Sequence, residues 1–78
     1  MKRDFVIDWF EEKSTMTRME LEKDLSINYF ENGLIDSFAF LELIAACEEK
    51  FNITFSDEDF SNDEIFTIAG LIKVLERK

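Results

Sequence analysis

The chain has 78 residues, of which 46% are hydrophobic, so it can form one small domain and leaves no room for a second. Its single cysteine excludes an internal disulfide, and the absence of histidine leaves no cluster of the usual zinc ligands. Its 18 acidic and 9 basic residues give a net charge of -9, which disfavours binding to nucleic acid or to anionic lipid.

The sequence also indicates where the protein works. The N-terminus has no apolar run followed by a cleavage site, and no stretch approaches the roughly 20 apolar residues that a membrane span requires. A lone cysteine suits a reducing compartment. We therefore expect a single cytoplasmic domain over residues 1–78, monomeric, with no membrane span and no bound metal.

The first predicted helix covers residues 1–13. Lys13 suits the C-terminal end of a helix, where a positive charge is favourable. Four large apolar residues recur at helical spacing and are expected to face the core: Phe5, Val6, Trp9 and Phe10.

Residues 14–31 show no clean apolar period, so they predict a long ordered loop. Within this loop, Thr17 and Glu20 have the spacing of a capping box, in which each side chain accepts a hydrogen bond from the other residue's backbone amide. A short helical turn after Thr17 is compatible with that spacing.

The turn over residues 32–36 leads directly into the longest helical pattern. Gly33 can adopt backbone angles that other residues avoid, and Asp36 can accept hydrogen bonds from the first free amides of a helix. We therefore predict a helix over Ser37–Phe51. At about 100° per residue, one side forms a stripe that should face the core: Phe40, Leu43, Ile44, Cys47 and Phe51.

A second set of residues on this helix, three apolar and three acidic, points in another direction from the stripe that faces the core. Acidic side chains are rarely buried, so the apolar residues beside them should stay in water. Residues 25–72 carry ten acidic side chains and one basic side chain, Lys50. Such a surface favours encounters with basic patches on other proteins, although an acidic face that only maintains solubility is an alternative. The set comprises Phe38, Leu41, Ala45, Glu42, Glu48 and Glu49.

Two further helices are expected after residue 51. Ser56 can cap a short third helix, and Thr67 can cap a fourth whose inner face would be Ile68, Leu71, Ile72 and Leu75. The acidic run over residues 57–64 lacks the glycine and glutamate positions of a calcium-binding EF-hand loop. The predicted fold is an all-α four-helix bundle, with three longer helices, a short third helix and a long loop between helices one and two.

Ser37 stands where the turn meets the second helix. An Asp-Ser pair at a helix start most often acts only as a cap. A serine nucleophile of the usual kind needs a base with a pKa suited to neutral pH, and the chain contains no histidine. We therefore expect no enzymatic activity from Ser37.

Around Ser37 the chain resembles the acyl carrier proteins and the related stand-alone aminoacyl and D-alanyl carriers. Their shared signature is an Asp-Ser dipeptide followed by an apolar residue, which stands here as Asp36-Ser37-Phe38. The resemblance continues through residues 41–44, 48–51 and 65–68, and it is weak over residues 1–25.

The resemblance implies the chemistry of a carrier. In that family the serine hydroxyl bears a 4′-phosphopantetheine arm whose thiol holds cargo as a thioester, which implies that Ser37 is the attachment site. The implied partners are a phosphopantetheinyl transferase and the acyl- or aminoacyl-transfer enzymes, with basic docking patches. The implied docking residues are Asp36, Phe38, Leu41, Glu42, Ala45, Glu48 and Glu49.

The cargo and the pathway stay open. The turn reads GLIDS where fatty-acid carriers commonly have GADS, and in this it resembles specialised carriers more closely. We hypothesise short or polar cargo, because five phenylalanines should crowd the core: Phe40, Phe51, Phe55, Phe60 and Phe66. An alternative from another class is an unmodified acidic helical adaptor that binds a basic or apolar groove on a partner.

Overall fold

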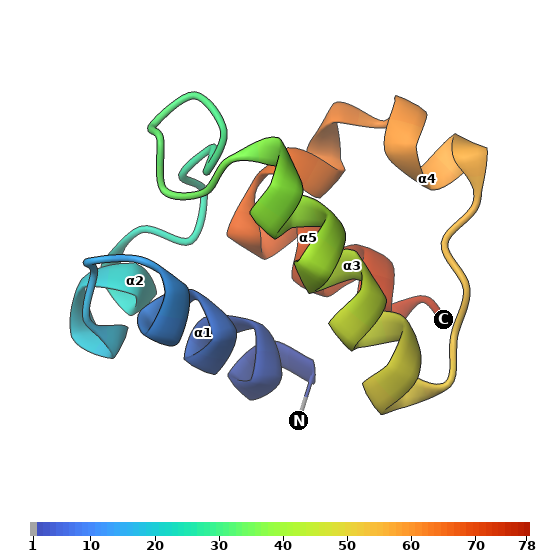
Figure 1. Cartoon of the computed structure of the whole chain (residues 1–78), viewed down its shortest axis with the longest axis horizontal. Helices are drawn as coiled ribbons and strands as arrows, with labels where there is room; N and C mark the ends of the chain where they lie inside the picture. Colours follow the sequence, from blue (N-terminus) through green and yellow to red (C-terminus); the bar gives the residue numbers. More distant parts are fainter. Residues whose placement is uncertain (1) are drawn as a thin grey trace.

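The structure is a computed structural model that describes residues 2–78. Five α-helices and one 3-10 helix follow one another within that range (Figure 1). The elements are α1 (Lys2–Lys13), α2 (Arg18–Lys23), α3 (Ser37–Phe51), α4 (Asp57–Ser61), η1 (Asp63–Phe66) and α5 (Ile68–Glu76). The all-α class is confirmed, and α1, α3, α4 and α5 are the four predicted helices. Met1, which the prediction included in the first helix, lies outside the described residues.

The long first connection contains more helix than the sequence pattern indicated. Thr17 and Glu20 form the predicted capping box, and six residues of α-helix follow it. The amide of Thr17 donates to the Glu20 carboxylate over 2.9 Å. The pattern missed the extent of α2 because Leu21 is the one residue of this helix that is buried, so no apolar period develops.

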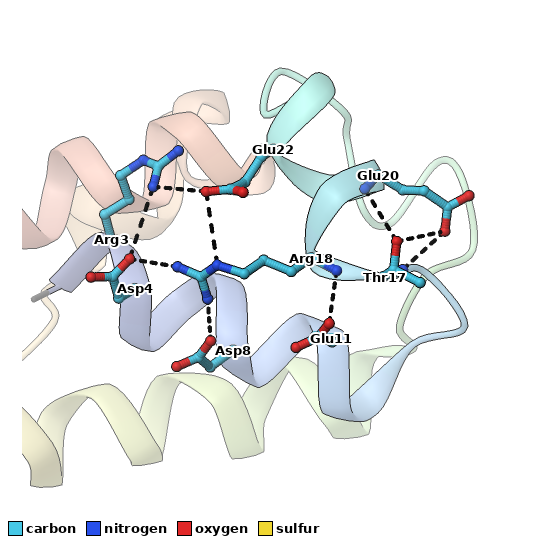
Figure 2. Close-up of polar contacts among 8 residues, drawn as sticks. All are labelled: Arg3, Asp4, Asp8, Glu11, Thr17, Arg18, Glu20 and Glu22. Carbon is cyan, nitrogen blue, oxygen red and sulfur yellow. Dashed lines mark hydrogen bonds and ion pairs between the residues drawn. The ribbon is translucent and has the colours of Figure 1, made fainter.

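Charged contacts attach α2 to α1. The Arg18 guanidinium lies between two carboxylates of α1 and contacts both Asp8 and Asp4, the latter over 2.6 Å (Figure 2). The Arg18 amide also donates to the Glu11 carboxylate over 2.8 Å. A network of several ion pairs can hold two helices together where an isolated surface pair contributes little.

The loop after α2 is ordered by hydrogen bonds to η1, to Thr67 and to the first turn of α5. Ala69 donates its amide to the Leu25 carbonyl over 2.7 Å, and Asn28 pairs with Thr67 in an isolated bridge. Tyr29 is fully buried and donates its hydroxyl hydrogen to the carbonyl of Ile65. Burial raises the pKa of the Tyr29 phenol, which therefore stays neutral. The predicted long ordered loop is confirmed.

The core lies between α1, α3 and α5. Val6, Ile7 and Phe10 supply its α1 side, whereas Phe5 and Trp9 are only partly buried against it. The α3 stripe is buried as predicted except at Phe51, which is also only partly buried. The inner face of α5 is buried throughout, and it includes Val74 beside the four predicted residues: Ile68, Leu71, Ile72 and Leu75.

Gly70 allows η1 to approach α5 closely. A Cβ atom placed on Gly70 would lie 1.8 Å from the carbonyl oxygen of Glu64, which is far inside any contact distance. η1 itself was not predicted, because Asp63–Phe66 forms a single 3-10 turn with one buried residue, Ile65. Among residues 2–78, no helix has the length and apolar character needed to cross a bilayer.

Candidate site at the start of helix α3

The turn before α3 has the conformation that its residues favour. Gly33 has a φ of +68°, in the left-handed region that glycine enters at least cost. Asn28 accepts hydrogen bonds from the amides of Phe30 and Glu31, each over 3.0 Å, which closes the start of the turn. The predicted role of Gly33 is confirmed.

Asp36 is the N-terminal cap of α3, as predicted. Its carboxylate accepts the amide hydrogen of Ala39 over 2.8 Å, and its carbonyl accepts that of Phe40 over 3.0 Å. An α-helix leaves its first amides without intrahelical partners, and its dipole makes this end positive. The first turn of α3 is therefore suited to a negatively charged group.

Ser37 is the first residue of α3 and is exposed. Within residues 2–78, none of the hydrogen bonds found engages its hydroxyl. The other four serines each have a hydrogen-bonded hydroxyl: Ser14, Ser26, Ser56 and Ser61. Because Asp36 already caps the helix, the Ser37 hydroxyl is available for chemistry at an open surface.

An apolar strip continues from Ser37 along the exposed side of α3. Phe38 is 74% exposed and Leu41 is 65% exposed, the largest hydrophobic exposures on this helix. Ala45, Glu42 and Glu49 are also exposed. The predicted exposure of these five residues is confirmed, and acidic side chains lie beside the apolar ones.

Glu48 differs from the expectation that it lies in water with its neighbours. It is half-buried, and its carboxylate accepts the amide hydrogen of Phe55 over 2.9 Å. The half-burial is tolerated because the carboxylate gains a hydrogen-bonding partner from the loop after α3. Spacing along one helix could not show this contact, since Phe55 lies outside that helix.

Aromatic rings fill the core directly beneath the first turn of α3. Phe40 lies one turn after Ser37, and its ring centroid is 5.1 Å from that of Phe30, 6.0 Å from Phe66 and 6.2 Å from Phe60. The predicted crowding is confirmed for Phe60 and Phe66, and Phe55 packs behind Phe60. The prediction is wrong for Phe51, whose ring packs against Phe5 of α1 instead, 5.2 Å away. Phe30 was missed, because it lies in the loop segment that showed no apolar period.

Cys47 is the only thiol in the chain and lies in the core. Burial, followed by the nearby charge of Glu48, raises its pKa to about 12. A protonated and buried thiol is a poor nucleophile. The chain therefore presents no reactive sulfur of its own at this site.

The comparisons with known proteins agree with this geometry. A family model described as "Phosphopantetheine attachment site" matches residues 14–75. The chain is similar to the D-alanyl carrier proteins of Bacillus cereus (strain B4264) and Bacillus anthracis (strain CDC 684 / NRRL 3495). Each is 38% identical over 56 residues, which cover 72% of this chain and 71% of the relative. No solved structure matches the chain significantly.

The family match spans most of the chain, and it includes the Asp36-Ser37 turn, all of α3 and the aromatic rings beneath them. The cofactor of the chain is accordingly a covalently attached 4′-phosphopantetheine. From these matches, the chain belongs to the family of phosphopantetheine-binding carrier proteins.

Proposed function

We propose that the chain bears 4′-phosphopantetheine on the Ser37 hydroxyl oxygen and presents acyl or aminoacyl cargo to partner enzymes. The observation that carries the proposal is the exposed Ser37 hydroxyl in the first turn of α3, next to a cap supplied by Asp36. In the modification, the Ser37 oxygen loses its proton and bonds to the phosphorus that bears the pantetheine arm of coenzyme A. The pyrophosphate bond of coenzyme A breaks, and the nucleotide part departs with the bridging oxygen. A phosphopantetheinyl transferase catalyses the step.

The residues present fit this cofactor. A phosphodiester at Ser37 would meet the positive end of the α3 dipole and the first amides of the helix, so modification should leave the fold intact. When bound, the cofactor supplies a terminal thiol that holds the cargo as a thioester. The protein itself catalyses no step: it positions the arm, and its buried Cys47 thiol does not compete for cargo.

The test is intact-mass measurement after incubation with coenzyme A, Mg²⁺ and a broad-specificity phosphopantetheinyl transferase. Wild-type protein should gain one phosphopantetheinyl group, and Ser37→Ala should gain none. Ser61→Ala is the matched control, because Ser61 also lies exposed on a helix, and it should be modified like wild type. If no protein is modified, the unmodified adaptor is favoured; if Ser37→Ala gains the same mass, the attachment lies elsewhere.

Partner enzymes are proposed to dock on α3 next to the arm. The proposed surface combines apolar residues that are already in water with acidic residues suited to basic patches. Asp36 is included because it borders Ser37, whereas Glu48 contributes less than expected because its carboxylate is committed to Phe55. The exposed docking residues are Asp36, Phe38, Leu41, Ala45, Glu42 and Glu49.

The proposed cargo is short or polar, with an amino acid as the favoured class. Two observations support this: the relatives are named D-alanyl carrier proteins, and the rings around Phe40 are closely packed. Forcing extra groups into a filled core typically costs about 1–3 kcal/mol. Buried methylenes return about 0.8 kcal/mol each, so a long chain could enter if the rings moved aside.

NMR of the modified protein, loaded with acetyl and then with octanoyl groups, tests the cargo proposal. Short cargo on an exposed arm predicts that both forms show the same chemical shifts for the core residues Ile44, Cys47 and Ile68. Broad shift changes at these residues in the octanoyl form alone would show that the core opens, and the short-cargo proposal would be abandoned.

A further inference from the structure

The segment around α4, residues 53–62, covers one side of the core and has one buried residue of its own, Phe55. None of the five residues of α4 is buried. Its main apolar contacts are aromatic: the Phe60 ring lies 5.9 Å from that of Phe55 and 6.2 Å from that of Phe40. Segments with little buried apolar surface are those that open locally while the rest of a protein stays folded.

Charge adds to this weakness. Residues 57–64 carry five acidic side chains, which repel one another. Two basic residues that follow α5 oppose this repulsion. Lys78 contacts the Asp59 carboxylate over 2.8 Å, and Arg77 contacts that of Glu64 over 3.3 Å. The first pair is better shielded, with side chains 22% and 19% exposed, so water and salt screen it less.

The Lys78–Asp59 pair lies at a point that affects the whole segment. Asp59 also accepts the Ser56 amide hydrogen over 2.8 Å in the capping box that starts α4. The Lys78 ammonium lies 5.5 Å from the centre of the Phe55 ring. One basic side chain therefore contacts both Asp59, the acidic member of the α4 capping box, and a ring of the aromatic cluster beneath it.

We propose that residues 53–62 open as a unit, separately from α1, α3 and α5, and that the Lys78–Asp59 ion pair controls how often they open. Opening uncovers the rings of Phe55 and Phe60, and with them one side of Phe40, one turn from Ser37. The inference goes beyond the proposed function and does not depend on modification of Ser37.

NMR-detected hydrogen exchange of the full chain tests the proposal. The probes are the backbone amides of Phe55, Ser56 and Phe60. Each is protected from exchange because it donates a hydrogen bond, to the Glu48 carboxylate, the Asp59 carboxylate and the Ser56 carbonyl respectively. Lys78→Met removes the charge and keeps an apolar side chain over the Phe55 ring. Lys73→Met is the matched control, with the same change in net charge at an exposed position on α5.

Lys78→Met should speed exchange at the three probes by about two- to fivefold, the range expected for the loss of one ion pair near the surface. Amides in the middle of α3 and α5 should keep their rates, and Lys73→Met should change none of them. Equal effects of the two variants, or a parallel change in α3 and α5, would overturn the proposal.

A double-mutant cycle separates the ion pair from the contact with Phe55. In an Asp59→Asn background the pair is already lost, so adding Lys78→Met should not speed exchange further. A further increase of the same size as in wild type would show that Lys78 acts through the ring and not through Asp59. The claim that the ion pair controls opening would then be rejected.

Discussion

Replacing Leu41 with alanine should weaken docking of partner enzymes chiefly by speeding their dissociation. Leu41 lies one turn after Ser37 at the centre of the apolar strip, and 65% of its surface is exposed in the free protein. A partner that covers the strip would remove this surface from water. Apolar contact at the centre of an interface affects dissociation more than association.

The magnitude follows from the exposed fraction. Full burial of a leucine side chain is worth about 1.5–3 kcal/mol, and the 65% that is exposed in the free chain corresponds to about 1–2 kcal/mol of that gain. Dissociation from the partner should therefore be about 5- to 30-fold faster for Leu41→Ala. Folding stability should change little, because the side chain has little surface buried to begin with.

Stopped-flow binding to the modifying transferase measures both rate constants. Met19→Ala is a matched control, because Met19 is 70% exposed but lies on α2, outside the proposed surface. It should bind like wild type. Unchanged dissociation for Leu41→Ala, or an equal effect of Met19→Ala, would refute the assignment of the docking surface to α3.

Three further outcomes are expected. Glu42→Lys should slow association with the transferase in a salt-dependent way, since exposed charges steer encounters; salt-independent rates equal to wild type would reduce this acid to a solubilising role. Gly70→Ala should lower the free energy of unfolding, measured in urea, by about 2 kcal/mol. The clash with the Glu64 carbonyl places overpacking at the upper end of its usual cost of about 1–3 kcal/mol, and helix propensity returns about 1 kcal/mol. The hydrogen bond from Lys78, followed by that from the Ser56 amide, lowers the pKa of Asp59 in the folded protein. The ionised carboxylate therefore stabilises the fold above its usual pKa of about 4. This stabilisation is lost as the pH falls through the lower pKa of the folded state. The stability difference between wild type and Asp59→Asn should accordingly shrink in acid.

The helix starts could be predicted because capping is local. The side chain of each cap accepts the amide hydrogen of the residue three positions further on, a bond that depends only on neighbouring backbone geometry. These caps are Asp36, Thr17, Ser56 and Thr67. The bounds of α3 and its exposed strip followed in the same way from 3.6-residue periodicity. The sequence by itself therefore determined the position of Ser37 at an open helix start.

Contacts between distant segments were decided only by the tertiary structure. Tyr29 is fully buried, and no pattern in the neighbouring residues predicts its burial. Its hydroxyl donates to the Ile65 carbonyl in η1, which is distant in the sequence. Helical spacing predicted that Glu48 lies in solvent. In the structure it is half-buried, because its carboxylate accepts a hydrogen bond from the amide of the loop residue Phe55. Both residues satisfy polar groups that only the packed arrangement of the chain brings together.

The same reason explains why local rules missed the extent of α2, the presence of η1 and the contact at Lys78. α2 and η1 each bury one residue, so no apolar period marks them, and packing against other elements holds them in place. Lys78 meets Asp59 only because the end of α5 lies beside α4 in the folded chain. Sequence periodicity detects helices that bury a face of their own, whereas ion pairs and hydrogen bonds across the fold depend on where distant segments come to lie.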